Sequence, residues 1–161
     1  MATEKTISSY LWDLVGQPAW GLKRTHGSMF FLEMGRSTSY GETSRGIDRV
    51  HGDWHFLFEL CKWSFSARDG IRISSQDTPA DIEEAFANLE LGEVQTAVFS
   101  EDPEELRITF TSEISLHVSP DETYLEPDDT EWIFFMPEEL SWDKKKATLT
   151  LGSIHRASQS I

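Results

Sequence analysis

Residues 54–65, WHFLFELCKWSF, carry the strongest strand pattern in the chain. Trp54, Phe56 and Phe58 alternate with mixed side chains, so one face of an extended segment would be wholly apolar. A strand with one apolar and one mixed face is typical of the centre of an antiparallel sheet. The alternation continues to Phe65. The segment therefore predicts a central antiparallel strand that continues past a bend.

Shorter patterns on both sides of this segment complete the predicted fold. Further strands are expected at residues 19–24, 28–34, 71–74, 94–99, 106–110, 114–118, 132–136 and 147–151. Helices are expected at 6–15 and 78–91, the second capped by Thr78 with Pro79 in its first turn. Polar residues 35–49, which include three glycines, are expected to form a mobile loop.

Strands in consecutive runs predict an α+β fold. We expect a single domain, largely antiparallel β-sheet with about nine strands and two helices, over residues 1–152. Residues 153–161 are polar and aperiodic and are expected to form a flexible C-terminal tail. The total of 161 residues suits one domain.

Charge is concentrated in the second half of the chain. The formal net charge is −14; residues 1–75 contain 8 acidic and 9 Lys or Arg residues, whereas 76–161 contain 20 and 5. This balance disfavours nucleic acid and anionic membranes as partners. The single cysteine excludes an internal disulfide. Without a signal peptide or an apolar run long enough to span a bilayer, a cytoplasmic location is expected.

The densest acidic stretch is residues 120–131, PDETYLEPDDTE, which has six acidic residues and no basic one. One interpretation is a solvated loop that maintains solubility. The other is a docking surface for a cationic protein, with aromatic anchors surrounded by charge. The candidate partner-binding residues are Asp121, Glu122, Tyr124, Glu126, Asp128, Asp129, Glu131 and Trp132.

A second candidate site lies at the entry to the central strand. On one strand, His51, Asp53 and His55 would project to the same face, and imidazole and carboxylate groups are metal ligands. Gly52 and Asp53 also suit a turn, in which case the histidines would bond to backbone or water. With His26, these residues form the alternative site of a metal- or small-molecule-dependent enzyme. Cys61 is expected to be a buried, inert thiol.

The chain also resembles a group of small, mostly uncharacterised bacterial proteins. Their signature of glycine and aromatic residues is GxxxWG…HGS…FG…GxWH…W. The matching stretches here are LVGQPAWG at 14–21, HGSMFFLEMG at 26–35, GDWH at 52–55, CKW at 61–63 and WIFFMP at 132–137. Small acidic proteins of this type resemble immunity proteins of contact-dependent growth inhibition and polymorphic toxin systems. The resemblance implies a cytoplasmic antidote that binds the toxic domain of a larger secreted protein.

Together these observations predict a non-catalytic, acidic binding protein without cofactor or metal. The expected function is that of an immunity protein that neutralises a cationic, nuclease-type toxin domain. Nucleic acid and membrane are not expected partners. The alternatives are the histidine-based enzyme and a homo-oligomer that pairs through exposed strand edges.

Overall fold

The computed structural model describes residues 7–42, 44–46, 48–123, 131–137, 140–143 and 148–151. Two helices and thirteen strands form within these residues. In chain order the elements are α1 (Ile7–Trp12), β1 (Pro18–Arg24), β2 (Phe30–Met34), β3 (Thr38–Glu42), β4 (Asp48–His51), β5 (Trp54–Phe58), β6 (Cys61–Ala67), β7 (Gly70–Ser74), α2 (Pro79–Asn88), β8 (Gly92–Glu101), β9 (Glu104–Phe110), β10 (Ser115–Pro120), β11 (Trp132–Met136), β12 (Leu140–Asp143) and β13 (Thr148–Leu151). The predicted α+β fold with a mainly antiparallel sheet is confirmed.

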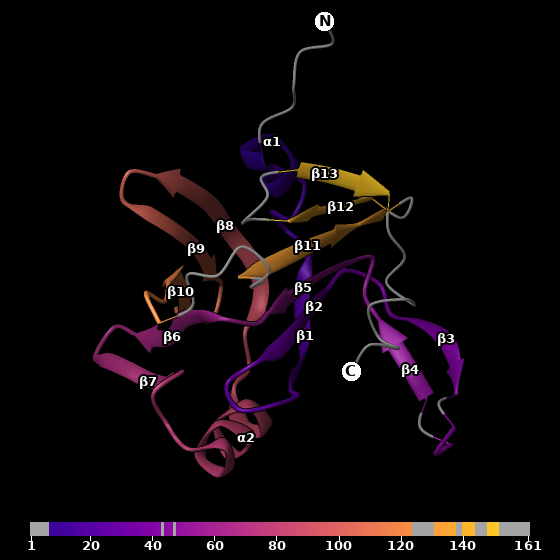
Figure 1. Ribbon diagram of the computed structural model, residues 1–161, viewed down its shortest axis with the longest axis horizontal. Coiled ribbons are helices and arrows are strands. Elements are labelled where there is room, and N and C mark those ends of the chain that lie inside the picture. Colours follow the sequence, from indigo (N-terminus) through magenta and orange to yellow (C-terminus); the bar gives the residue numbers. More distant parts are fainter. Residues whose placement is uncertain are drawn as a thin grey trace, which may run out of the picture.

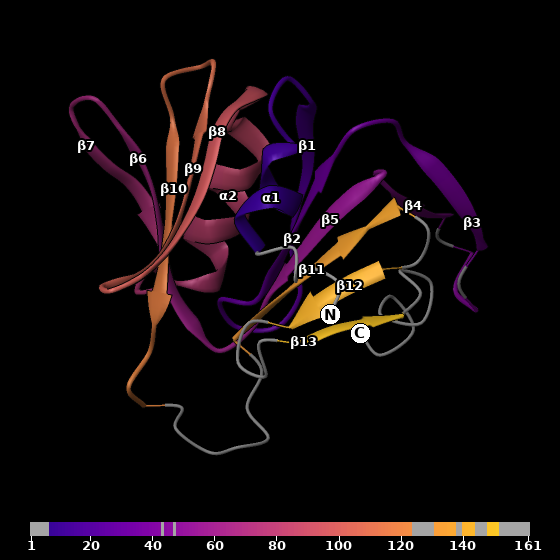
Figure 2. The same ribbon diagram turned by 90° about the horizontal axis from the view of Figure 1, so that it is seen from above.

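Eleven of the described strands form one sheet in the order β13-β12-β11-β5-β2-β1-β8-β9-β10-β6-β7. The sheet bends so that its two halves, β13 to β1 and β8 to β7, face each other, with α1 and α2 at opposite ends of the space between them (Figure 1, Figure 2). The halves meet where β1 pairs with β8 through Pro18–Glu93 and Ala19–Gly92. By contrast, β8 and β9 pair from Val94–Phe110 to Glu101–Glu104.

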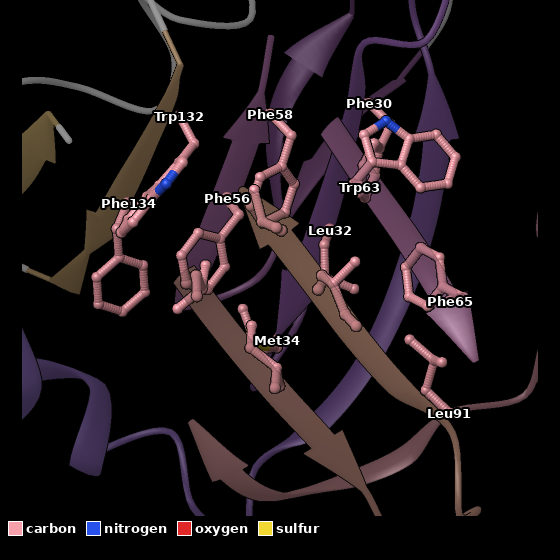
Figure 3. Packing of buried hydrophobic residues seen from close by; sticks show 14 of the residues in the cluster. Phe30, Leu32, Met34, Phe56, Phe58, Trp63, Phe65, Leu91, Trp132 and Phe134 are labelled. Atoms are coloured by element: carbon pink, nitrogen blue, oxygen red, sulfur yellow. The ribbon is translucent and has the colours of Figure 1, made fainter. Parts of the chain in front are cut away.

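The main hydrophobic core fills the space between the two halves. Alternate residues of β2, β5 and β11 point inward, as the strand period requires, and meet Trp63 and Phe65 from β6 (Figure 3). Phe30 lies at the centre of the aromatic contacts, with ring centroids 4.8 Å from both Phe58 and Trp63. Cys61 is buried as expected, at 3% exposure.

Helix α2 begins and packs as its sequence predicts. The Thr78 hydroxyl accepts a hydrogen bond from the Asp81 amide at 3.2 Å, and Pro79 occupies the first turn. The helix buries Ile82 and Phe86 in the core and ends before Leu89, earlier than the predicted position 91. Helix α1 ends at Trp12 rather than at residue 15, because hydrogen bonds from Leu14 to Leu11 and from Val15 to Trp12 tighten the chain into turns.

The expectation of a loop at residues 35–49 is wrong in part. Strands β3 and β4 form a separate two-stranded sheet in this region, with Thr38 opposite His51 and Ser39 opposite Val50. Backbone pairing defines this hairpin, and its mostly polar side chains provide no apolar alternation that would mark it in the sequence. The hairpin lies at the side of the main sheet, next to β5 (Figure 1).

Strand β12 was not expected, and it pairs between β11 and β13. The predicted tail, 153–161, lies outside the described residues. Neither described helix has the length and apolar character needed to cross a membrane.

Candidate functional site

A buried glutamate flanked by two histidines stands out in the described structure. Glu33 lies in β2 directly opposite His55 in β5. Along β2, Phe30, Leu32 and Met34 enter the main core, so the alternation places Glu33 on the other face of the sheet. Directly opposed residues of an antiparallel pair have Cβ atoms about 4.5–5.5 Å apart, close enough for their side chains to meet.

His51 reaches the same point from the end of β4. Between it and β5, Gly52 passes so close to β2 that a Cβ atom there would overlap the backbone oxygen of Met34. The Gly52 amide also donates to Oε2 of Glu33 at 3.4 Å. The absence of a side chain at residue 52 thus lets the β4–β5 connection hold His51 against the carboxylate.

Hydrogen bonds join the three side chains. Nδ1 of His51 lies 2.5 Å from Oε1 of Glu33, and Nδ1 of His55 lies 2.6 Å from Oε1 and 2.7 Å from Oε2. An ionised carboxylate only accepts hydrogen bonds, so the Nδ1–H group of each histidine donates a hydrogen bond to Glu33. Glu33, His51 and His55 are 3%, 7% and 0% exposed, which places the cluster out of contact with bulk water.

Gly21 provides the space for the Glu33 side chain. It has a φ of +66°, and a Cβ atom at this position would lie 2.6 Å from Cγ of Glu33. That separation is well inside van der Waals contact, so an alanine would displace the glutamate. Gly21 and Gly52 therefore flank the site from two neighbouring segments.

The imidazole of His55 lies between aromatic rings. Its centroid is 4.4 Å from that of Phe31, 5.1 Å from Phe135 and 4.5 Å from His51. Phe31 and Phe135 belong with Leu57 to a small apolar cluster on this face of the sheet. In the part of the chain that the structure describes, Nε2 of His55 is buried and has no hydrogen-bond partner. One of the two ring nitrogens of His55 therefore makes no hydrogen bond to the described residues.

Burial and hydrogen bonding act in opposite directions on the cluster. Burial would raise the pKa of Glu33, but the hydrogen bonds from His51 and His55 outweigh it and hold that pKa below its ordinary value. Burial lowers the pKa of His55 despite the opposing effect of Glu33. At neutral pH the cluster thus combines an ionised carboxylate with a neutral His55. Carboxylate and neutral imidazole are the forms that bind metal ions or accept protons.

Only part of the predicted histidine site forms. His51 and His55 meet, but Asp53 accepts a hydrogen bond from the Arg36 amide at 3.1 Å and takes no part in the cluster. His26 is exposed in the turn between β1 and β2 and also lies outside the cluster. The expected constellation is wrong because the chain turns at residues 52 and 53 instead of continuing as one strand.

Sequence reasoning missed Glu33, which supplies the centre of the cluster. The available signal was a single charged residue inside the apolar stretch from Met29 to Met34. A charge buried in a strand needs a partner, and histidines on the next strand are suitable ones.

The predicted partner-binding residues have several different placements. Asp121 is half-buried and Glu122 exposed, whereas Tyr124, Glu126, Asp128 and Asp129 lie outside the described residues. Glu131 and Trp132 are buried, at 8% and 2% exposure. The indole of Trp132 packs against Phe56, Phe58 and Phe99 in the core. This corrects the expectation that Trp132 is a surface anchor: its alternation in β11 directs it inward.

Comparisons of the chain with protein-family models, with curated proteins and with solved structures found no match.

Proposed function

We propose that this chain binds a cationic protein partner. In line with the resemblance seen in the sequence, the proposed partner is a nuclease-type toxin domain, which the chain would neutralise as a cytoplasmic immunity protein. The observation that carries the proposal is the acidic excess of residues 76–161, which contain 20 of the 28 acidic residues.

Much of this charge lies on the described surface. Asp81 and Glu84 on α2, Glu93 at the start of β8 and Glu101 at its end are all exposed. Within the described part of the chain, none of them forms an ion pair. The acidic residues of 76–161 that do so there are Glu83 with Arg24, Glu105 with Arg107 and His117, and Glu113 with Arg68. Acidic groups left without cations repel one another and cost folding stability, so a cationic partner would relieve that cost.

The same charge would assist inhibition of a nuclease. Nucleases bind the phosphates of their substrate through Lys and Arg side chains. An acidic protein is attracted to such a cleft and would compete with the substrate for it. Complementary charge raises association rates by about 10–1,000-fold, and salt reduces the effect. Asp121 and Glu122, next to the rest of the acidic stretch, are the described residues proposed to face the partner.

The test screens basic nuclease-type toxin domains as the partner, beginning with any that is encoded beside this chain. Nuclease activity is titrated with the purified chain, and the association rate constant is measured at several salt concentrations. We expect inhibition at one chain per nuclease and an association rate that falls as salt rises. Undiminished nuclease activity at excess chain would contradict the proposal.

A pair of charge-matched variants locates the surface. The test variant is Glu122→Gln with Asp128→Asn and Asp129→Asn. The control removes the same number of charges elsewhere: Glu84→Gln, Glu90→Gln and Glu93→Gln, all at exposed positions. We expect the test variant to associate on the order of tenfold more slowly than the control, since steering depends on charge near the contact. Equal rates for the two variants would show that residues 120–131 only solvate the chain.

A further inference from the structure

We propose that Glu33, His51 and His55 bind one divalent transition-metal ion, with Zn²⁺ the best fit. This inference is independent of the proposed binding of a cationic partner, which concerns the acidic surface. The site lies on the face of the sheet opposite the main core, at the crossing of β2, β5 and the end of β4.

The three side chains supply ligand atoms that suit a transition-metal ion. Each of the three residues offers one ligand atom, and these atoms lie within 4.8 Å of one another. Two imidazoles and a carboxylate suit Zn²⁺ and similar ions, and are the three protein ligands of many catalytic zinc sites. Mg²⁺ and Ca²⁺ favour oxygen-rich sites and fit this set poorly. The residues come from three separate segments that the fold brings together.

The unpartnered nitrogen of His55 leaves its ring free to change tautomer. The side chain is 0% exposed, and within the described residues Nε2 has no hydrogen-bond partner. Nδ1 is the nitrogen directed at Glu33, so it is the ligand atom that the geometry offers. No competing bond within the described residues keeps the proton on Nδ1, so that proton can move to Nε2 when Nδ1 binds the ion.

The burial of the carboxylate also favours a cation at this position. Glu33 is 3% exposed, and its described ion pairs involve only His51 and His55. A carboxylate removed from bulk water needs compensation, which a divalent cation would supply.

Binding requires a small local adjustment. Ligand atoms bound to tetrahedral zinc at about 2.0–2.1 Å lie about 3.3 Å apart. The present nitrogen–oxygen distances are 2.5–2.7 Å, so the Glu33 carboxylate would have to withdraw slightly from both rings. When Nδ1 of a neutral histidine binds the ion, its proton moves to Nε2 and none is released.

The experiment measures Zn²⁺ uptake by the chelator-treated full-length chain, with Co²⁺ as a visible probe of coordination geometry. We expect one ion per chain and the intense absorption of tetrahedral Co²⁺. Uptake should fall at least tenfold in Glu33→Gln and in His51→Gln. It should persist in Asp53→Asn and His26→Gln, the matched controls outside the cluster. No uptake by the unaltered chain, or equal uptake by all variants, which would indicate adventitious surface binding, overturns the proposal.

A second measurement does not depend on the variants folding. Histidine ring ¹⁵N spectra of the unaltered chain are recorded with increasing Zn²⁺. We expect the ring nitrogens of His51 and His55 to shift at one equivalent while those of His26 and His117 stay in place. Shifts confined to the latter two, or a uniform gradual drift of all rings, would contradict a site at Glu33.

Discussion

Replacement of Gly21 by alanine tests how tightly the structure holds Glu33. At φ +66°, a non-glycine residue costs about 1–2 kcal/mol. The new Cβ would also lie 2.6 Å from Cγ and 3.0 Å from Cβ of Glu33. Overpacking of this kind costs about 1–3 kcal/mol. We expect Gly21→Ala to lower the free energy of unfolding by about 2–5 kcal/mol in total.

Urea denaturation followed by tryptophan fluorescence provides the assay. With a urea m value of about 2 kcal/mol/M, the midpoint should fall by about 1–2.5 M while the slope is unchanged. Gly27→Ala is the matched control, because Gly27 has a φ of +54° and an added Cβ would have nothing within 4 Å. It should show the cost of the backbone conformation alone.

A double-mutant cycle completes the test. In a Glu33→Ala background Cγ is absent and only the 3.0 Å contact with Cβ of residue 33 remains, so the cost of Gly21→Ala should be clearly smaller than in the unaltered chain. Two results would refute the reasoning: a Gly21→Ala cost no larger than that of Gly27→Ala, or an equally large Gly21→Ala cost with and without Glu33.

Three further predictions concern pH, capping and the core. The hydrogen bond from His117 holds the pKa of Glu105 below its ordinary value of 4.5. The folded chain therefore binds this proton less readily than the unfolded chain, and the stabilisation is lost as pH falls below about 4.5. Urea titrations should show a smaller acid-induced loss of stability in Glu105→Gln; an identical pH profile would contradict this. Thr78→Ala should lower the free energy of unfolding by about 1 kcal/mol by removing the cap of α2, and no change in the urea midpoint would disprove the role of the cap. Phe56→Ala, at a fully buried ring, should lower the free energy of unfolding by about 3–5 kcal/mol. Ile71→Ala is the control, because Ile71 is 67% exposed, and it should lower that free energy far less in the same assay. Similar losses of stability in the two variants would contradict the burial of Phe56.

The sequence predicts the elements whose side chains follow a physical period. Alternation at residues 54–65 marks strand structure there, since strand geometry sends successive residues to opposite faces. The expected single strand is in fact two, β5 and β6, which lie in opposite halves of the sheet. Thr78 and Pro79 mark the start of α2 because a helix terminus has unsatisfied amides that a hydroxyl can bond. Local chemistry decides both features, so one sequence is enough to find them.

The candidate site was less predictable because its parts are brought together only by long-range pairing. Glu33 and His55 are 22 residues apart, and their contact depends on the pairing of β2 with β5. His51 approaches because β3 and β4 form a hairpin of mostly polar residues, which no hydrophobic pattern indicates. The inward direction of Trp132 likewise depends on the place of β11 beside β5. Register and strand order are properties of the whole chain, and residue spacing does not encode them locally.

The short pairing between β1 and β8 has a consequence for how the molecule resists opening. Backbone bonds make each half of the sheet a continuous ribbon, but between β1 and β8 the strand register includes only Pro18–Glu93 and Ala19–Gly92. Backbone hydrogen bonds from Gly16 to Val94 and from Val94 to Gln17 extend this junction a little. Cohesion between the halves depends on this short junction together with side chains such as Phe30 and Trp63, whose rings meet across the core. Truncation of those rings would weaken the contact between the two halves before it weakened the strand pairing within either half. The two halves would then begin to unfold as separate cooperative units.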